Sequence, residues 1–257
     1  MIDREKVMKS LECCGNHNRN LSCADCEYAG YGEDGDKDEC TSMLAYDAWM
    51  LMKEWEKAAE KDSAKVFTIA GSVKELKKRL SAGETPEIGQ IVLHVNGMSW
   101  CCIHQTKDHV VLMMIRAYDW RPFARPCKQY PYGWNNYEHS QIRRELNTEV
   151  LDALFGEEKD LLLEYGPGMG KLFLMSEEEV GFNQTAMTFD WFKGENKEGL
   201  NSRRSMMDLD GDKTPWWLRG TTPSSCNDVR LVYTGGSLGG DGAFVAFGLV
   251  AACVIPK

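Results

Sequence analysis

The sequence lacks the segments that direct a protein to or across a membrane. Residues Met1 to Lys6 are charged and favour a helix, and they lack the apolar core of a signal peptide. No later stretch approaches the roughly 18 consecutive apolar residues of a membrane-spanning helix. We therefore expect a cytoplasmic protein.

The chain also lacks an excess of basic residues. It has 30 Lys and Arg against 39 Asp and Glu, a formal net charge of -9. Because an acidic surface does not attract a nucleic-acid backbone or an anionic membrane, we expect neither as a partner. The pairs Arg143-Arg144 and Arg203-Arg204 are candidates for binding phosphate, but on an acidic chain we expect them to pair with carboxylates such as Glu145 and Asp208.

Signatures of common catalytic sites are missing as well. No serine lies in a Gly-x-Ser-x-Gly turn, and the run Gly166 to Gly170 lacks the Lys-Ser or Lys-Thr pair of a phosphate-binding loop. Histidines are scattered over predicted strands and a helix start, which favours structural roles; they include His94, His104, His109 and His139. We expect no catalytic residues and a protein that is not an enzyme.

Cysteines are abundant near the start of the chain. In the absence of an export signal we expect thiols or metal ligands, not disulfides. The spacing of Cys23 and Cys26 allows two thiolates to face one tetrahedral ion. We predict a structural zinc site, and its four ligands are Cys14, Cys23, Cys26 and Cys40, with Cys13 as the alternative to Cys14. The competing interpretation is reduced cysteines that pack as small hydrophobic side chains.

The cysteine distribution divides the chain into two predicted domains. Residues 1–62 form a small Cys-rich helical module, and residues 66–257 form a second, larger domain. The larger domain is predicted to open with a strand at 66–69 and a short amphipathic helix at 72–80. In that helix Ser72 and Glu75 have the spacing of a capping box.

Strand and helix patterns alternate irregularly through the second domain. Two strands, 91–95 and 100–104, flank Asn96-Gly97, a strong hairpin signal, and a third strand follows at 110–115. Helical spacing covers 140–155, and a strand at 171–175 leads into a helix start at Ser176 to Glu179. With a final strand at the C-terminus, this order predicts an α+β fold with short antiparallel sheets and flanking helices.

In the last forty or so residues, a pair of tryptophans is followed by a segment with few side chains that could pack in a core. Tyr233 to Gly242 is too rich in glycine to form a helix or a central strand. Neighbouring residues on a strand face opposite sides, so we expect one of Trp216 and Trp217 in the core and the other at a surface pocket. This pattern is typical of a binding surface.

Several of these pieces occur together in a known family. They are Gly89 to Val92 with Trp100, the helix Ser140 to Asn147, the segment Lys171 to Val180, then Trp216 to Arg219 and Gly248 to Ile255. In this respect the chain resembles a family of bacterial and phage domains of unknown function, which is similar to the C-type-lectin-like fold of the formylglycine-generating-enzyme group. The copper-binding cysteines of those enzymes have no counterparts here, so oxidase activity is not implied.

The resemblance implies a role in ligand binding. Such domains serve as variable proteins of diversity-generating retroelements, in which the last part of the gene is rewritten while the backbone is kept. By that analogy the varied interval is Thr221 to Phe247, with an unknown protein or other macromolecule as the partner. The implied ligand-binding residues are Trp217 as an aromatic floor and Thr222, Ser224, Ser225, Cys226, Asn227, Tyr233, Ser237, Leu238, Asp241, Phe244 and Phe247. The alternative is an invariant structural or assembly protein of a phage or mobile element.

Overall fold

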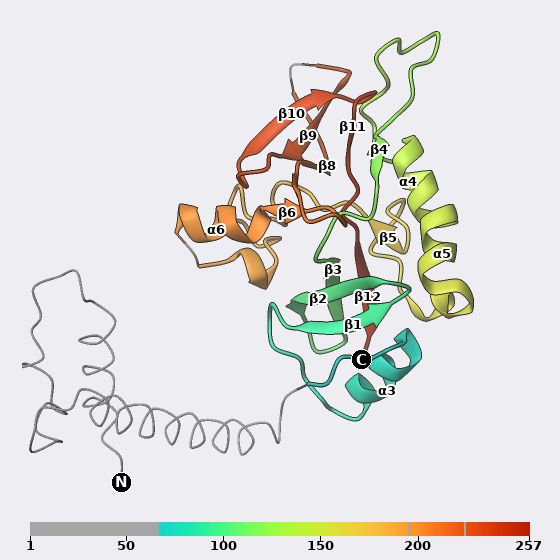
Figure 1. Ribbon diagram of the computed structural model, residues 1–257, viewed down its shortest axis with the longest axis vertical. Helices are drawn as coiled ribbons and strands as arrows, with labels where there is room; N and C mark the ends of the chain where they lie inside the picture. Colours follow the sequence, from blue (N-terminus) through green and yellow to red (C-terminus); the bar gives the residue numbers. More distant parts are fainter. Residues whose placement is uncertain (1–66, 195, 224) are drawn as a thin grey trace, which may run out of the picture. The chain divides into compact units, whose positions relative to one another are not determined.

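The computed structural model describes residues 67–194, 196–223 and 225–257, and Phe67–Lys257 forms a compact unit by itself (Figure 1). The predicted Cys-rich module at 1–62, its four zinc ligands Cys14, Cys23, Cys26 and Cys40, and Ser224 lie outside the described residues. These predictions are therefore not tested by the structure.

The first of the two large sheets has five strands and is antiparallel throughout. Its order is β1-β2-β3-β12-β5, with β1 at Ile91–Val95, β2 at Met98–Gln105, β3 at His109–Met114, β12 at Ala252–Pro256 and β5 at Leu172–Phe173. The predicted meander of three strands is confirmed. Asn96 and Gly97 form the hairpin turn with φ of 46° and 79°, as the Asn-Gly signal predicts.

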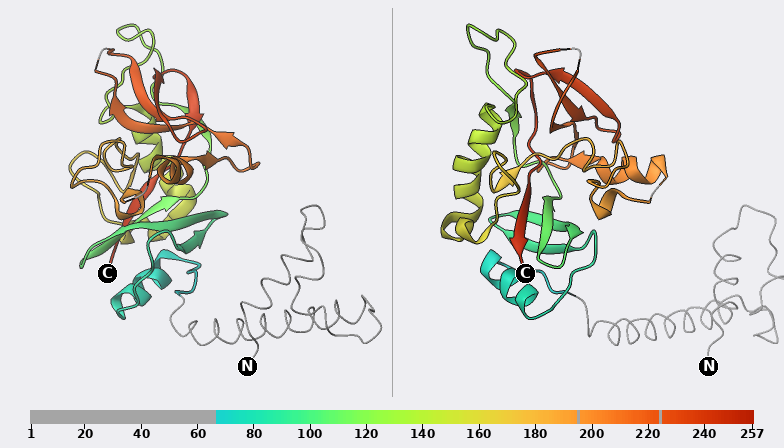
Figure 2. Two further views of the ribbon diagram at one scale, coloured as in Figure 1. Left: turned by 90° about the vertical axis from the view of Figure 1, so that its left-hand side faces the viewer. Right: turned by 180° about the vertical axis from the view of Figure 1, so that it is seen from behind.

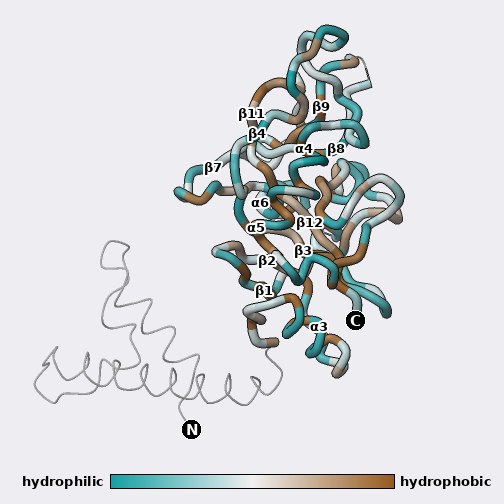
Figure 3. The backbone as a smooth tube through the Cα atoms, turned by 90° about the vertical axis from the view of Figure 1, so that its right-hand side faces the viewer, coloured by the Kyte–Doolittle hydropathy of each residue, from teal (hydrophilic) through white to brown (hydrophobic). Residues whose placement is uncertain are grey.

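The last strand lies in the middle of this sheet. Cys253 pairs with Leu112 of β3 on one side and with Leu172 of β5 on the other. Residues 252–255 are all buried, and the strand is among the hydrophobic segments inside the unit (Figure 3). Since β2 and β3 separate β12 from β1, the first and last strands do not pair directly. The strand predicted at 66–69 is not found over its described residues 67–69, and only the next residue, Ala70, forms a single bridge to Leu93.

Helix α3 (Val73–Ser81) follows that bridge. Ser72 Oγ accepts a hydrogen bond from the Glu75 amide at 3.1 Å, so the predicted cap is confirmed. The reciprocal bond is displaced by one residue, because the Glu75 carboxylate accepts from the amide of Gly71 at 2.9 Å. The apolar face of the helix is buried against the core.

The helix predicted at 140–155 is also confirmed. It comprises α4 (Gln141–Glu145), a π-helical turn (Leu146–Val150) and α5 (Leu151–Phe155), and it lies on the opposite side of the unit from α6 (Figure 2). Asn147 in the π-helical turn binds the edge of the first sheet. Its Nδ2 donates to the Leu172 carbonyl at 2.8 Å and its Oδ1 accepts from the Lys171 amide at 2.8 Å.

A second sheet has the order β10-β9-β8-β11-β4. Its strands are β4 at Trp120–Pro122, β8 at Trp216–Thr221, β9 at Asp228–Val232, β10 at Leu238–Gly242 and β11 at Ala246–Gly248. Beside it lie α6 (Lys197–Arg204) and a hairpin of β6 (Met206–Met207) and β7 (Lys213–Thr214). Helices and several small, mainly antiparallel sheets together agree with the predicted α+β class.

The helix predicted to start at Ser176 is wrong. The capping bonds do form, since Ser176 Oγ accepts from the Glu179 amide at 3.2 Å and the Glu179 carboxylate accepts from the Ser176 amide at 2.8 Å. The chain nevertheless makes turns over 177–181, and Gly181 has a φ of 73°, which ends any helical course. A local capping pattern therefore closes a loop here.

Glu179 has a tertiary partner in Arg219. The Glu179 side chain is fully buried and that of Arg219 is 12% exposed. Nη1 of Arg219 donates to Glu179 Oε2 at 2.6 Å and to the Leu174 carbonyl at 2.7 Å, and Tyr165 donates its hydroxyl to Glu179 at 2.6 Å. Burial lowers the pKa of Arg219, but the bonds to Glu179 outweigh it and the net pKa is raised.

Removing one partner of this pair should destabilise the protein strongly. We expect Arg219→Met to lower the free energy of unfolding by about 3–5 kcal/mol, because the Glu179 carboxylate would remain buried without its cation. Urea denaturation followed by tryptophan fluorescence measures the change. As the control, Asp160→Asn removes the exposed partner of Lys171 and should leave the midpoint unchanged. Equal effects of the two substitutions would contradict this role of the buried pair.

Candidate functional site

Most of the described ligand-binding residues predicted from the sequence lie at two opposite ends of β10, whereas Trp217 lies on β8 and Phe247 on β11. Leu238 at the start of β10 pairs with Val232, and Gly242 at the end of β10 pairs with Asp228. Tyr233, Ser237 and Leu238 belong to one end, next to α6. At the other end, which we call the loop end, the described residues of the β8–β9 loop (222, 223 and 225–227) and residues 241–245 meet the loop 125–136 (Figure 1).

Hydrogen bonds fix the backbone of the loop end. The Ala243 amide donates to the Asn227 carbonyl at 2.8 Å. Asn135, which is 7% exposed, donates its side-chain amide to the carbonyls of Ser225 and Asp228 at 2.8 and 3.1 Å. Ser225 Oγ accepts from the amides of Asn227 and Asp228 at 3.1 Å each, so Ser225 shapes the turn itself.

Exposed aromatic and polar side chains stand on this fixed backbone. Phe244 is 46% exposed and Tyr132 is 58% exposed, and their ring centroids are 5.9 Å apart. Cys226 and Asp241 are exposed and Asn227 is half-buried. The hydroxyl of Thr222 is buried and has no hydrogen-bond partner within the described residues, so it is not presented to a ligand in this structure.

The contribution of the loop 125–136 was missed in the sequence. Tyr130, Trp134 and His139 form a stack with centroid separations of 5.0 and 5.3 Å, beside the exposed ring of Tyr132. The run from Tyr130 to Tyr137 contains four aromatic residues, and this density was the signal available in the sequence. Only the fold shows that Tyr132 of this run lies against Phe244.

The glycines of β10 give the aromatic rings room to lie on the strand. A Cβ at Gly239 would come within 2.3 Å of the Tyr233 ring, and one at Gly242 within 2.7 Å of the Phe244 ring. As predicted, this segment is neither a helix nor a central strand: β10 is the edge strand of its sheet. Its glycines set the positions of two exposed aromatic side chains.

Both tryptophans of β8 are buried, contrary to the prediction that one would line a surface pocket. Trp216 and Trp217 are 0% exposed. Trp217 donates its indole N–H to the Arg121 carbonyl at 2.9 Å and packs edge-on against Phe247 at 4.9 Å. Because other segments of the protein cover both faces of β8, neither indole ring reaches solvent. Trp217 therefore supports half-buried Phe247 from below and is not a floor that a ligand touches.

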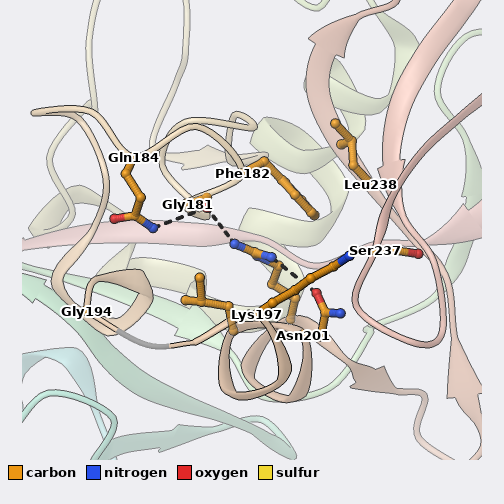
Figure 4. A pocket seen from close by; sticks show the side chains of 10 residues that line it. Gly181, Phe182, Gln184, Gly194, Lys197, Asn201, Ser237 and Leu238 are labelled. Carbon is orange, nitrogen blue, oxygen red and sulfur yellow. Dashed lines mark hydrogen bonds between the residues drawn. The ribbon is translucent and has the colours of Figure 1, made fainter.

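At the other end of β10, Ser237 and Leu238 line a pocket of about 810 Å³ (Figure 4). Figure 4 shows Phe182 and Leu238 along one side and Lys197 and Asn201 along the other. Arg204 also lines it and is 3% exposed. The expected ion pair of Arg204 with Asp208 does not form, because its guanidinium donates to the carbonyls of Val180 and Gly181.

The most enzyme-like contact is between His104 and Asp190. His104 Nδ1 lies 2.7 Å from Asp190 Oδ2, and Lys193 binds the other oxygen at 2.8 Å. Burial opposes ionisation of Asp190, but the bonds from Lys193 and His104 lower its pKa. Cys102, on the same strand as His104, is fully buried, and burial raises its pKa to about 11, so it does not supply a thiolate.

Within 67–194, 196–223 and 225–257, no group of three or more His, Cys, Asp or Glu is arranged to hold a metal ion. No helix in the same ranges is long and apolar enough to cross a membrane.

Residues 107–257 match the model of a family described as a domain of unknown function, DUF6273, and the chain belongs to this family. The match begins just after β2 and takes in both the second sheet and the strands β3, β5 and β12. No curated protein and no solved structure matches the chain significantly.

The described cysteines should differ sharply in reactivity. Cys127 and Cys226 are exposed, whereas burial raises the pKa of Cys101 to about 12 and also raises that of Cys253. At pH 8 we expect iodoacetamide to modify the exposed pair at least about a hundredfold faster than the buried thiols. Peptide mapping by mass spectrometry separates the sites. Comparable labelling of Cys253 and Cys226 in the native protein would contradict the placement of β12 in the core.

Proposed function

We propose that the protein is a non-enzymatic binding protein and that the loop end of the second sheet is its recognition surface. The supporting observation is the combination of a hydrogen-bonded backbone with exposed aromatic and small polar side chains. Rigid aromatic residues give contact area at a low entropy cost, and neighbouring polar groups adapt to a partner. Phe244 and Tyr132 are the central contacts in this proposal.

The proposal includes a finer hypothesis about fold and variation. A C-type-lectin-like domain varied by a diversity-generating retroelement needs side chains that can change without disturbing the backbone. Cys226, Asp241 and Phe244 meet this need because they are exposed. Trp216 and Val229 do not, because they are fully buried. The alternative remains an invariant interaction domain of a phage or mobile element.

Gene sequences from several isolates test this hypothesis. If the segment is diversified, substitutions should concentrate at exposed positions between residues 221 and 247 and should match adenines in a nearby repeat beside a reverse-transcriptase gene. Buried positions such as Val229 and Leu231 should stay constant. Substitutions spread evenly along the chain, without such a repeat, would leave only the invariant alternative.

A binding experiment tests the surface itself. The full-length protein is applied to an array of immobilised proteins, peptides and glycans, and each ligand found is titrated against two variants. We expect Phe244→Ala to weaken binding at least about tenfold, since a central aromatic contact contributes about 2 kcal/mol or more. Trp120→Ala is the matched control, because Trp120 is 47% exposed but lies on β4 at the end opposite Pro122, which leads into the loop end.

The two variants give a clear decision. A ligand that loses affinity for Phe244→Ala and keeps it for Trp120→Ala supports the loop end. Ligands that bind both variants like the parent protein would overturn the proposed surface. Circular dichroism of each variant shows whether a loss of binding follows from a loss of folding.

A further inference from the structure

The pocket next to α6 has the size of a small-molecule site. Its volume of about 810 Å³ lies within the usual range of roughly 300–1,000 Å³ for ligand pockets. It lies at the end of β10 away from the loop end. None of the described residues that line it is acidic.

Arg204 is a buried cation whose hydrogen-bond partners among the described residues are two carbonyls and one side-chain amide oxygen. Its Nε donates to the Val180 carbonyl at 2.7 Å and Nη2 donates to the Gly181 carbonyl at 2.6 Å. Nη1 has only a long bond of 3.4 Å to Asn201 Oδ1. No Asp or Glu of the described residues forms an ion pair with it, and burial lowers its pKa.

The comparison with Arg219 shows what Arg204 lacks. Arg219 is also largely buried and also donates to a backbone carbonyl, but its positive charge faces the Glu179 carboxylate. The guanidinium carbon of Arg204 lies 4.0 Å from the centre of the Phe182 ring, and this cation–π contact offsets part of the cost of burying the charge. A buried charge without a counter-charge is costly, and an anion at Nη1 would remove that cost.

A second cation lies at the same pocket. Lys197 is exposed at the first turn of α6 and forms no ion pair with the described residues. Leu200, Leu238 and Phe182 supply the apolar part of the lining. A pocket lined by both cationic and apolar side chains is complementary to a molecule with an anionic head and an apolar body.

We propose that this pocket binds a small organic anion whose carboxylate or phosphate group lies between Nη1 of Arg204 and the Lys197 ammonium. The apolar body of the ligand packs against Phe182, Leu200 and Leu238. The proposal does not depend on recognition at the loop end.

The test uses the full-length protein and calorimetric titration with benzoate and with phenyl phosphate, which distinguish the two head groups. Benzamide has a similar shape without the charge. We expect at least one of the anions to bind saturably and at least about tenfold more tightly than benzamide, because charge-assisted hydrogen bonds are about twice as strong as neutral ones. Raising the salt concentration should weaken the preferred anion.

Variants locate the binding. Lys197→Gln should weaken the preferred anion about fivefold, whereas Lys74→Gln, the same charge change at an exposed residue of α3, should not. Ser237→Phe should abolish binding by filling the pocket, since Ser237 is exposed and its side chain forms no described hydrogen bond. These substitutions leave Arg204, which fastens the turn at 180–181, in place.

Three results would overturn the proposal. They are no saturable binding of either anion, equal affinity for benzamide, or binding that Lys197→Gln and Ser237→Phe leave unchanged. Because Phe244 is not part of the pocket, Phe244→Ala should bind the anion like the parent protein. The experiment therefore distinguishes a failure of the proposed anion pocket from a failure of the proposed recognition surface at the loop end.

Discussion

The ion pair between Glu179 and Arg219 joins the two sheets of the protein. Glu179 lies in the turns that follow β5 of the first sheet, and Arg219 lies on β8 of the second. The same segment is held by a backbone bond from the Arg219 amide to the Met175 carbonyl at 3.0 Å and by Arg204 at the carbonyls of Val180 and Gly181. Burial of both charges is tolerable because each has several hydrogen-bond partners. These contacts, together with the shared hydrophobic core, fix the relative position of the sheets.

A second sheet fixed in this way can carry exposed loops without losing its backbone geometry. Asn135 fastens the β8–β9 loop, and the indoles of Trp216 and Trp217 fill both faces of β8 beneath it. The side chains at the loop end are then free to contact a partner, which is the basis of the proposed recognition role. At the other end of β10 the same rigidity leaves a pocket beside Arg204. The two surfaces differ in chemistry, since one is aromatic and polar and the other is basic and apolar.

Much of the fold was predictable because short-range chemistry specifies it. Asn96-Gly97 forms its turn, Ser72 caps its helix, and the apolar spacing of 140–155 gives a helix that packs on the core. The prediction failed at Ser176, where the capping bonds form but Glu179 is bound by Arg219 and Gly181 turns the chain. It failed again at Trp217, because alternation along a strand tells which side a residue faces but not whether that side is covered.

The sequence by itself determined the α+β class, the meander of β1, β2 and β3, the helices at 73–81 and 141–155, and a glycine-rich segment that is neither a helix nor a central strand. These features depend on residues that are close in the chain, so they can be predicted from sequence patterns without knowledge of the fold. Only the tertiary structure decided that most of the described binding residues divide between two ends of β10, that Tyr132 lies against Phe244, and that Arg204 is buried with no ion pair to a carboxylate of the described residues. The contact between Tyr132 and Phe244 joins segments about a hundred residues apart, and the course of the chain between them is decided by packing of the whole core.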